Sequence, residues 1–199
     1  MADEIISRCH ERGVRTAEAE RRLAHQFRRH SVQRRYLAVA HGACAPRTFR
    51  SFLAPDRGDG LRGTWRGRGE SPEGAKRAVT RIEVRERLNG ATLVACALET
   101  GRTHQIRIHL AHIGCPVLCD RLYGGRARIS ELELIPRDKL GHDSGEQERA
   151  AAQMLLERQA LHAERLTINH PTTSERMTFE APLPADLQQI LAALRRWRT

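Results

Sequence analysis

The stretch that decides the fold is Glu99-Thr100-Gly101-Arg102-Thr103-His104-Gln105-Ile106-Arg107-Ile108-His109-Leu110-Ala111-His112-Ile113-Gly114. It predicts a strand that ends near Leu98, a sharp turn at Gly101, and a helix with Thr103 as its N-cap. Residues at helical spacing give this helix one apolar face, made of Ile106, Leu110 and Ile113. Gly114 and Pro116 then end the helix.

Two arginines stand near the start of this helix, Arg102 at its entrance and Arg107 one turn inside. Side chains at a strand-to-helix junction reach a ligand above the sheet, and a helix N-terminus favours an anion. The stretch is therefore the first candidate for a binding or catalytic site.

A hairpin leads into this stretch. Residues 78–88 alternate between apolar and charged side chains, which is typical of a half-buried strand. Asn89-Gly90 predicts a type I′ turn, and residues 92–98 form the return strand. A hairpin followed directly by a helix with polar residues at its start is typical of an α+β domain. We therefore predict a mixed, mainly antiparallel sheet with flanking helices.

Periodicity places the other elements. Thr16 is predicted to cap a helix that buries Leu23 and Phe27. Further strands and helices follow from alternation, helix-forming residues and apolar stripes. The predicted strands are 36–40, 166–170 and 177–180, and the predicted helices are 146–162 and one after Pro184 with the stripe Leu187, Ile190, Leu191, Leu194 and Trp197.

Three segments lack a regular pattern: residues 1–15, residues 46–74 and residues 126–146. The second is rich in Gly, Arg, Pro and Asp and is predicted to be a long loop, and the third a polar surface excursion. Basic residues around Trp65 fit contact with single-stranded RNA, and equally a solvated loop with one buried ring. We find no repeat and no second core, so residues 1–199 are predicted to form one domain.

The charge of the chain favours a polyanionic partner. Its 199 residues carry a formal net charge of +10, and Arg far outnumbers Lys. Arginine forks match phosphate oxygens, although a basic surface also serves solubility alone. No apolar run approaches the roughly 20 residues that span a bilayer, and the acidic start leads into no signal-peptide core. We therefore expect a cytoplasmic protein without membrane contact.

The cysteines and histidines do not predict a metal site. The chain has five cysteines, and an odd number argues against a secreted disulfide framework. Cys115 and Cys119 lie near His109 and His112, but their spacing matches no standard zinc pattern. We expect no metal.

The central stretch resembles the third motif of the RluA-type RNA pseudouridine synthases, which reads Thr-Gly-Arg-Thr-His-Gln-Ile-Arg-x-His. Further matching positions follow it and precede it along the chain. They are residues 110–124, 158–163, 170–171 and 181–184, with 26–27, 32 and 35–38 upstream. The resemblance implies the catalytic fold of that family, with its N-terminal part missing.

The resemblance also implies a reaction, the isomerisation of uridine to pseudouridine in ribosomal or transfer RNA, without a cofactor. Tyr36 would pack its ring on the flipped uracil and assist proton removal. Arg107 would pair with the catalytic aspartate and keep it ionised. The resemblance implies that Arg102, His104 and Gln105 order the motif or contact RNA phosphate and the flipped nucleotide. Arg35 and the loop residues Trp65 and Arg66 are further candidates for RNA contact.

The family segment with the nucleophilic aspartate, His-Arg-Leu-Asp-Arg-x-Thr-Ser-Gly, is not found. It should lie just before the helix that begins at Thr16. Alignment back from Thr16 places the family's aspartate near Glu4, which stands next to Asp3. Neither residue has the flanking pattern, and misplacing a reacting group by ~1 Å can cost on the order of 10²-fold in rate. We expect Asp120 to be a structural carboxylate. The chain is then the C-terminal portion of such an enzyme, with an exposed sheet edge and poor stability.

Three functions stay open at this point. The first is the synthase, the second a catalytically inactive RNA-binding remnant or truncated product of a frameshifted gene, and the third an interaction domain without an RNA role. Tritium release from RNA labelled at uridine C5 separates the first from the second. Absent or salt-insensitive RNA binding would favour the third.

Overall fold

A computed structural model describes residues 16–56, 58, 60–65, 71, 73–135, 145 and 153–196. Its strands are β1 (Gln33–His41), β2 (Arg47–Leu53), β3 (Thr64–Trp65), β4 (Lys76–Leu88), β5 (Ala91–Leu98), β6 (Ile129–Ser130), β7 (Met154–Leu156), β8 (Leu161–Asn169) and β9 (Arg176–Glu180). Its helices are α2 (Ala17–Arg28), α3 (Gln105–His112), the short 3-10 helix η1 (Leu132–Leu134) and α5 (Ala185–Arg196).

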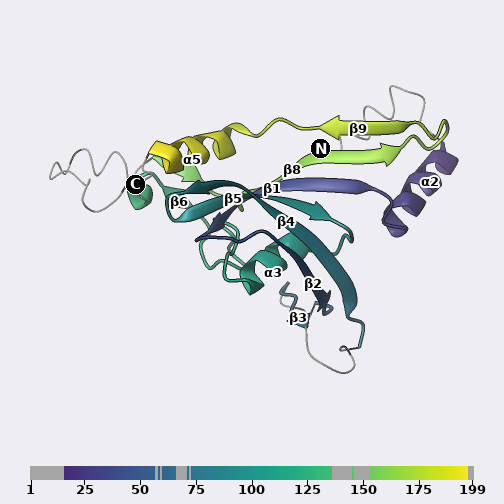
Figure 1. The fold of residues 1–199 in the computed structure, drawn as a ribbon, viewed down its shortest axis with the longest axis horizontal. Coiled ribbons are helices and arrows are strands. Elements are labelled where there is room, and N and C mark those ends of the chain that lie inside the picture. The colour runs from purple at the N-terminus through teal and green to yellow at the C-terminus, as the bar shows by residue number, and fades with distance from the viewer. Residues whose placement is uncertain are drawn as a thin grey trace.

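Seven of these strands form one sheet in the order β3-β2-β4-β5-β1-β8-β9 (Figure 1). Every pair in it is antiparallel. Strands β6 and β7 form a separate small pair. The predicted α+β class with a mainly antiparallel sheet and flanking helices is therefore confirmed. The sheet ends in two short strands, β3 and β9, and short edge strands limit pairing with another chain.

The hairpin of β4 and β5 supplies the middle of the sheet. Leu88 pairs with Ala91 across the two-residue turn Asn89-Gly90, as the sequence predicts. Gly90 has a φ of +59°, but Asn89 is not among the described residues with positive φ. The predicted type I′ geometry is therefore wrong, because that turn needs a positive φ at both positions.

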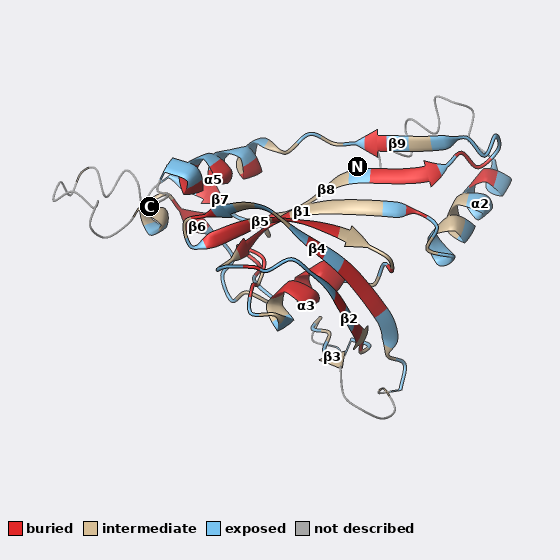
Figure 2. Ribbon diagram, in the orientation of Figure 1, coloured by how far each residue is buried: buried red, intermediate tan, exposed pale blue. Residues whose placement is uncertain are grey.

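The main core runs along β1 and β5 and includes residues of α3 and α5. In α3, Ile106 and Leu110 are buried as predicted, whereas Ile113 is only half-buried. Figure 2 shows α3 buried over most of its length, so it is an interior helix and not a surface helix with one apolar face. The predicted stripe of α5 is buried at Leu187, Ile190, Leu191 and Leu194, and Trp197 lies outside the described residues.

Helix α2 lies at one end of β1, β8 and β9, and α5 near the other end (Figure 1). Thr16 caps α2 as predicted, because its Oγ1 accepts a hydrogen bond of 3.2 Å from the Ala19 N–H. Ala19 and Leu23, one turn apart, make the apolar contact with the sheet. Phe27 in the last turn is 43% exposed, so its predicted burial is wrong.

The predicted loop over 46–74 is wrong for residues 47–53, which form β2, and for residues 64–65, which form β3. Phe49, Ser51 and Leu53 are buried and alternate with more exposed residues. This period of two is the strand signal, and the Gly, Arg and Pro residues around it obscured it in a composition-based assignment. Arg66 and residues 67–70 lie outside the described residues.

The predicted helix over 146–162 is wrong where the structure describes it. Met154–Leu156 is strand β7, and Leu161 and His162 begin β8 opposite Ala38 and Leu37 of β1. Leu155 and Leu156 are buried in the main core. Pairing and burial here outweigh the helix propensity of the segment. The predicted excursion over 126–146 contains β6 and η1.

None of the described helices is long and apolar enough to cross a membrane.

Candidate functional site

Gln105 is the buried centre of the junction between β5 and α3. Its side chain is 2% exposed. Its Oε1 accepts hydrogen bonds from the Thr100 hydroxyl (2.8 Å) and the Arg102 N–H (3.1 Å). Its Nε2 donates to Val79 O and to Thr80 Oγ1, both at 3.0 Å. These bonds use the whole amide, so the prediction that Gln105 contacts RNA is wrong. Gln105 orders the motif instead.

Helix α3 begins differently from the prediction. Its N-cap residue is His104, not Thr103, and His104 has a left-handed φ of +57° and no side-chain capping bond. The His104 ring turns to Tyr123, whose hydroxyl lies 3.1 Å from Nδ1 and accepts the Arg62 N–H at 3.2 Å. Burial, with Arg107 and Arg62 nearby, lowers the pKa of His104. Its ring is therefore neutral at pH 7.

Arg107 forms a buried ion pair with Asp120. Its Nε and Nη2 donate to the two carboxylate oxygens, each at 2.7 Å. The side chains are 9% and 0% exposed. The guanidinium carbon also lies 5.0 Å from the centre of the Tyr123 ring. The sequence predicts that Arg107 pairs with the catalytic aspartate, but in this structure its carboxylate partner is Asp120.

Asp120 has the bonding of a structural carboxylate. Its Oδ1 also accepts the N–H groups of Leu122 (3.0 Å) and Tyr123 (3.1 Å). Burial alone would raise the pKa of Asp120, but the hydrogen bonds from Arg107 and the two backbone N–H groups outweigh it and hold the pKa below its usual value. A fully buried carboxylate with these bonds cannot reach a substrate, so it is not the nucleophile.

Tyr36 is half-buried on β1, opposite Cys96 of β5 and Ala163 of β8. The register of β1 and β8 shifts between Arg35 and Tyr36, and such irregularities re-aim side chains next to active sites. Tyr36 packs against the main core. Within the described ranges, no hydrogen bond, ion pair or ring contact joins it directly to Arg107.

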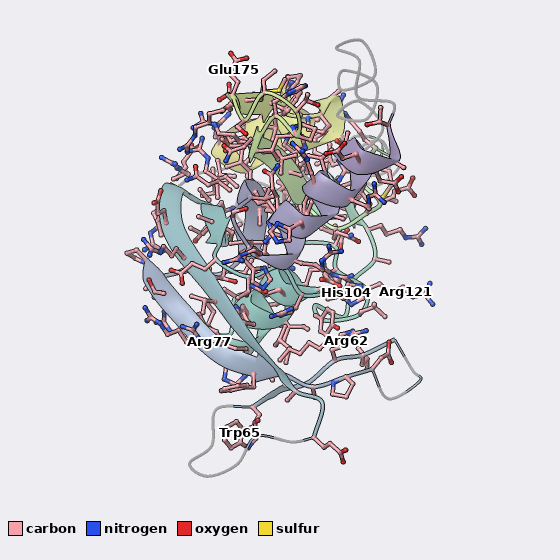
Figure 3. The ribbon with its side chains drawn as sticks, turned by 90° about the vertical axis from the view of Figure 1, so that its right-hand side faces the viewer. Arg62, Trp65, Arg77, His104, Arg121 and Glu175 are labelled. Atoms are coloured by element: carbon pink, nitrogen blue, oxygen red, sulfur yellow. The ribbon has the colours of Figure 1, made fainter. Side chains whose placement is uncertain are left out.

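The predicted RNA-contacting residues near the motif reach the surface to different degrees. Arg102 is half-exposed, and its Nε donates to Arg77 O at 3.2 Å. In Figure 3, Arg77, His104, Arg62 and Arg121 lie between α2 and the end of the molecule that carries Trp65. At the start of α3, Arg102 thus contacts Arg77, and His104 shares the Tyr123 hydroxyl with the Arg62 N–H.

Arg35 and Trp65 already have partners within the protein. Arg35 forms an ion pair with Glu164 on β8. The Trp65 ring meets Phe52 edge-on, with ring centres 5.9 Å apart. Both side chains are half-buried, so only part of each is left for RNA. In the part of the chain that the structure describes, no group of three or more His, Cys, Asp or Glu residues could hold a metal ion.

Sequence reasoning missed Arg34. The signal was available, because the family resemblance around Tyr36 has the pattern Arg/Lys-x-Tyr-x-Ala, and Arg34 occupies its basic position. A Cβ atom added to Gly101 would lie only 1.9 Å from Arg34 Nη1. Gly101 has no positive φ, so its role is to admit this close approach and not a left-handed turn.

Comparisons with known proteins point to one family. The model of the RNA pseudouridylate synthase family matches residues 15–112. The chain is 39% identical to the ribosomal large subunit pseudouridine synthase D of Xylella fastidiosa, over 92% of this chain and 50% of that protein. It is 37% identical to the protein of the same name from Pseudomonas aeruginosa, over 93% and 52%. The chain thus spans about half the length of these curated relatives.

Solved structures show the same fold. The human RNA pseudouridylate synthase domain containing 4 superimposes with a TM-score of 0.62 at 20% identity, over 90% of this chain and 69% of that one. The human RNA pseudouridylate synthase domain containing 1 gives a TM-score of 0.59 at 24% identity, over 91% and 73%.

Proposed function

Because the chain belongs to the family of RluA-type RNA pseudouridine synthases, we propose that the protein isomerises uridine to pseudouridine in RNA, in the cytoplasm. The reaction breaks the bond between ribose C1′ and uracil N1 and joins C1′ to uracil C5. The hydrogen on C5 leaves as a proton, and N1 gains one. A base within folded RNA must first leave its stack, at a cost of a few kcal/mol.

One observation carries this proposal: hydrogen bonds of buried side chains hold the motif of residues 100–107 in place, while other polar side chains of the motif stay half-exposed. Gln105 and Arg107 are buried and hydrogen-bonded within the protein, whereas Arg102 and His104 are half-exposed. Tyr36 lies on β1, which pairs with the strand that leads into the motif. In the proposal, the Tyr36 ring packs on the flipped uracil and its hydroxyl assists removal of the C5 proton. Arg107 holds the start of α3 through Asp120.

Ribosomal RNA of the large subunit is the proposed substrate. The named function of the two bacterial relatives supports it over transfer RNA. The net charge of +10 suits a long polyanion.

Tritium release from large-subunit RNA labelled at uridine C5 tests this proposal. The protein should release tritium, and Tyr36→Phe should slow the release by about 100-fold, the range of a lost proton-transfer group. Retention of the same RNA on filters provides the control, because Tyr36→Phe should leave it largely unchanged. Equal rates for both proteins would show that the Tyr36 hydroxyl takes no part in removing the C5 proton.

A second candidate is RNA binding without catalysis. Two observations favour it: Asp120 already occupies the Nε and Nη2 atoms of Arg107, and the family's aspartate segment is not found in these 199 residues. Retention of RNA without tritium release would identify this function.

A further inference from the structure

Arg34, His30 and Arg102 form what we call the basic corner, where α2 meets β1 and the loop after β5. Arg102 Nη2 lies 3.4 Å from His30 Nε2. The Arg34 guanidinium lies against Gly101. A groove of about 440 Å³ borders Arg34 and His30 and has residues of β1, β4, β5 and β8 along its walls. A groove of this volume is within the range of small-ligand sites.

Arg34 differs from the other arginines that line this groove, because each of the others has a carboxylate partner. The pairs are Arg35 with Glu164, Arg81 with Glu99, and Arg165 with Glu180. Arg34 has no such partner among the described residues, and its Nε and Nη2 atoms are buried without a hydrogen bond. Buried donors without an acceptor lower stability, and a native protein that keeps them needs a reason.

The two atoms form the side-on fork of a guanidinium, which binds an oxyanion through two parallel hydrogen bonds. This fold uses the same fork elsewhere. Arg107 binds Asp120 through Nε and Nη2, and Arg158 binds Asp186 through the same two atoms. The unpaired fork of Arg34 therefore has the two donors that an oxyanion needs.

His30 adds a third donor. Arginine only donates hydrogen bonds, so His30 Nε2 accepts from Arg102, and a neutral ring then carries its proton on Nδ1. This Nδ1 is also buried without a partner in the described parts of the chain. Burial, together with Arg102 and Arg34, lowers the pKa of His30, which keeps the ring neutral at pH 7. All three unpartnered atoms are donors, so a suitable ligand is a negatively charged acceptor.

We propose that the basic corner binds a backbone phosphate of the RNA substrate, with Arg34 as the residue that grips it. The proposal rests on the proposed function and adds a specific contact to it. A phosphate suits the corner because Arg34 and Arg102 bring two positive charges that no described carboxylate neutralises. Arg34 is a positioning residue, since phosphate contacts fix the register of an RNA and do not take part in the chemistry.

Arg34→Gln tests the contact, with Arg81→Gln as the matched control. Both variants lose one charge from the same groove, but Arg81 is already paired with Glu99. The affinity for a fluorescein-labelled RNA hairpin is measured across a KCl series. Arg34→Gln should raise Kd about tenfold or more, because charge-assisted hydrogen bonds to phosphate are lost. It should also reduce the slope of log K against log salt by about 0.7–0.9, one phosphate contact. Arg81→Gln should change both quantities much less, and equal effects of the two variants would overturn the proposal.

Gly101→Ala tests position separately from charge. Its added Cβ would stand where the Arg34 guanidinium lies, so the guanidinium must move while the net charge stays the same. We expect RNA affinity to fall in this variant as well. Unchanged affinity in both Gly101→Ala and Arg34→Gln would overturn the proposal.

Thermal unfolding without RNA separates ligand binding from a structural role. Arg34→Gln should keep or raise Tm, because it removes buried donors that have no partner. A lowered Tm with unchanged RNA affinity would make Arg34 structural and overturn the proposal. If the unsubstituted chain binds the hairpin with a steep salt dependence and only the Arg34 effect is absent, the proposed function survives. If that chain does not bind RNA at all, both fail.

Discussion

Replacing Asp120 with Asn should lower the free energy of unfolding by about 3–5 kcal/mol, the usual loss when one partner of a buried ion pair is removed. Arg107 would stay buried with its full charge, and its two bonds of 2.7 Å would face a neutral amide. The same substitution weakens the turn that Asp120 holds through the N–H groups of Leu122 and Tyr123. Urea unfolding at pH 7 measures the loss as a lower midpoint at an unchanged m-value.

Asp186→Asn is the control for this result. Asp186 also binds an arginine through Nε and Nη2, at 2.8 and 2.9 Å, and also accepts a backbone N–H. That pair is exposed, with side-chain exposures of 44% for Arg158 and 36% for Asp186. Its loss should cost at most about 1 kcal/mol. Equal losses at the two sites would contradict the view that burial makes the Arg107 pair essential to the fold.

His109 should make the protein less stable as the pH falls from about 6.5 to about 4. The side chain is fully buried, with Nδ1 2.8 Å from Thr80 Oγ1 and Nε2 3.0 Å from Ser51 Oγ. Burial, and to a lesser extent His112, lowers the pKa of His109 to about 4. In this window the unfolded chain binds a proton that the folded chain excludes, so stability rises with pH. The difference in pKa corresponds to about 3 kcal/mol.

His109→Gln isolates this effect, because glutamine hydrogen-bonds without titrating. The free energy of unfolding of the variant should fall by about 3 kcal/mol less between pH 7 and pH 4 than that of the unsubstituted protein. Parallel profiles for the protein and His109→Gln would show that the buried ring does not drive the acid sensitivity.

Local patterns predicted most of the sheet and the helices α2, α3 and α5, and failed where long-range pairing decides the structure. The hairpin around Asn89-Gly90 and the stripe of α5 follow from the period of their apolar residues. Met154–Leu156 has the residues of a helix but pairs with β6 and packs against α5. Its partners lie far away in sequence, and no local rule indicates them.

In the site, too, local sequence patterns indicate some residues, and contacts between distant residues decide others. The motif of residues 99–114 and Tyr36 could be found from the sequence, because the family resemblance marks them. The partner of Arg107 could not, because Asp120 lies 13 positions away beyond the end of α3. The basic corner could not be found from the sequence either. It depends on the close approach of Arg34 on β1 to Gly101 in the loop after β5.

The most direct test of the central claim is a map of pseudouridines in the large-subunit ribosomal RNA of cells with and without the gene. If the protein is a ribosomal RNA pseudouridine synthase, specific pseudouridines should disappear on deletion and return when the gene is restored. They should fail to return with the Tyr36→Phe gene. An unchanged set of pseudouridines in the deletion strain would contradict the account.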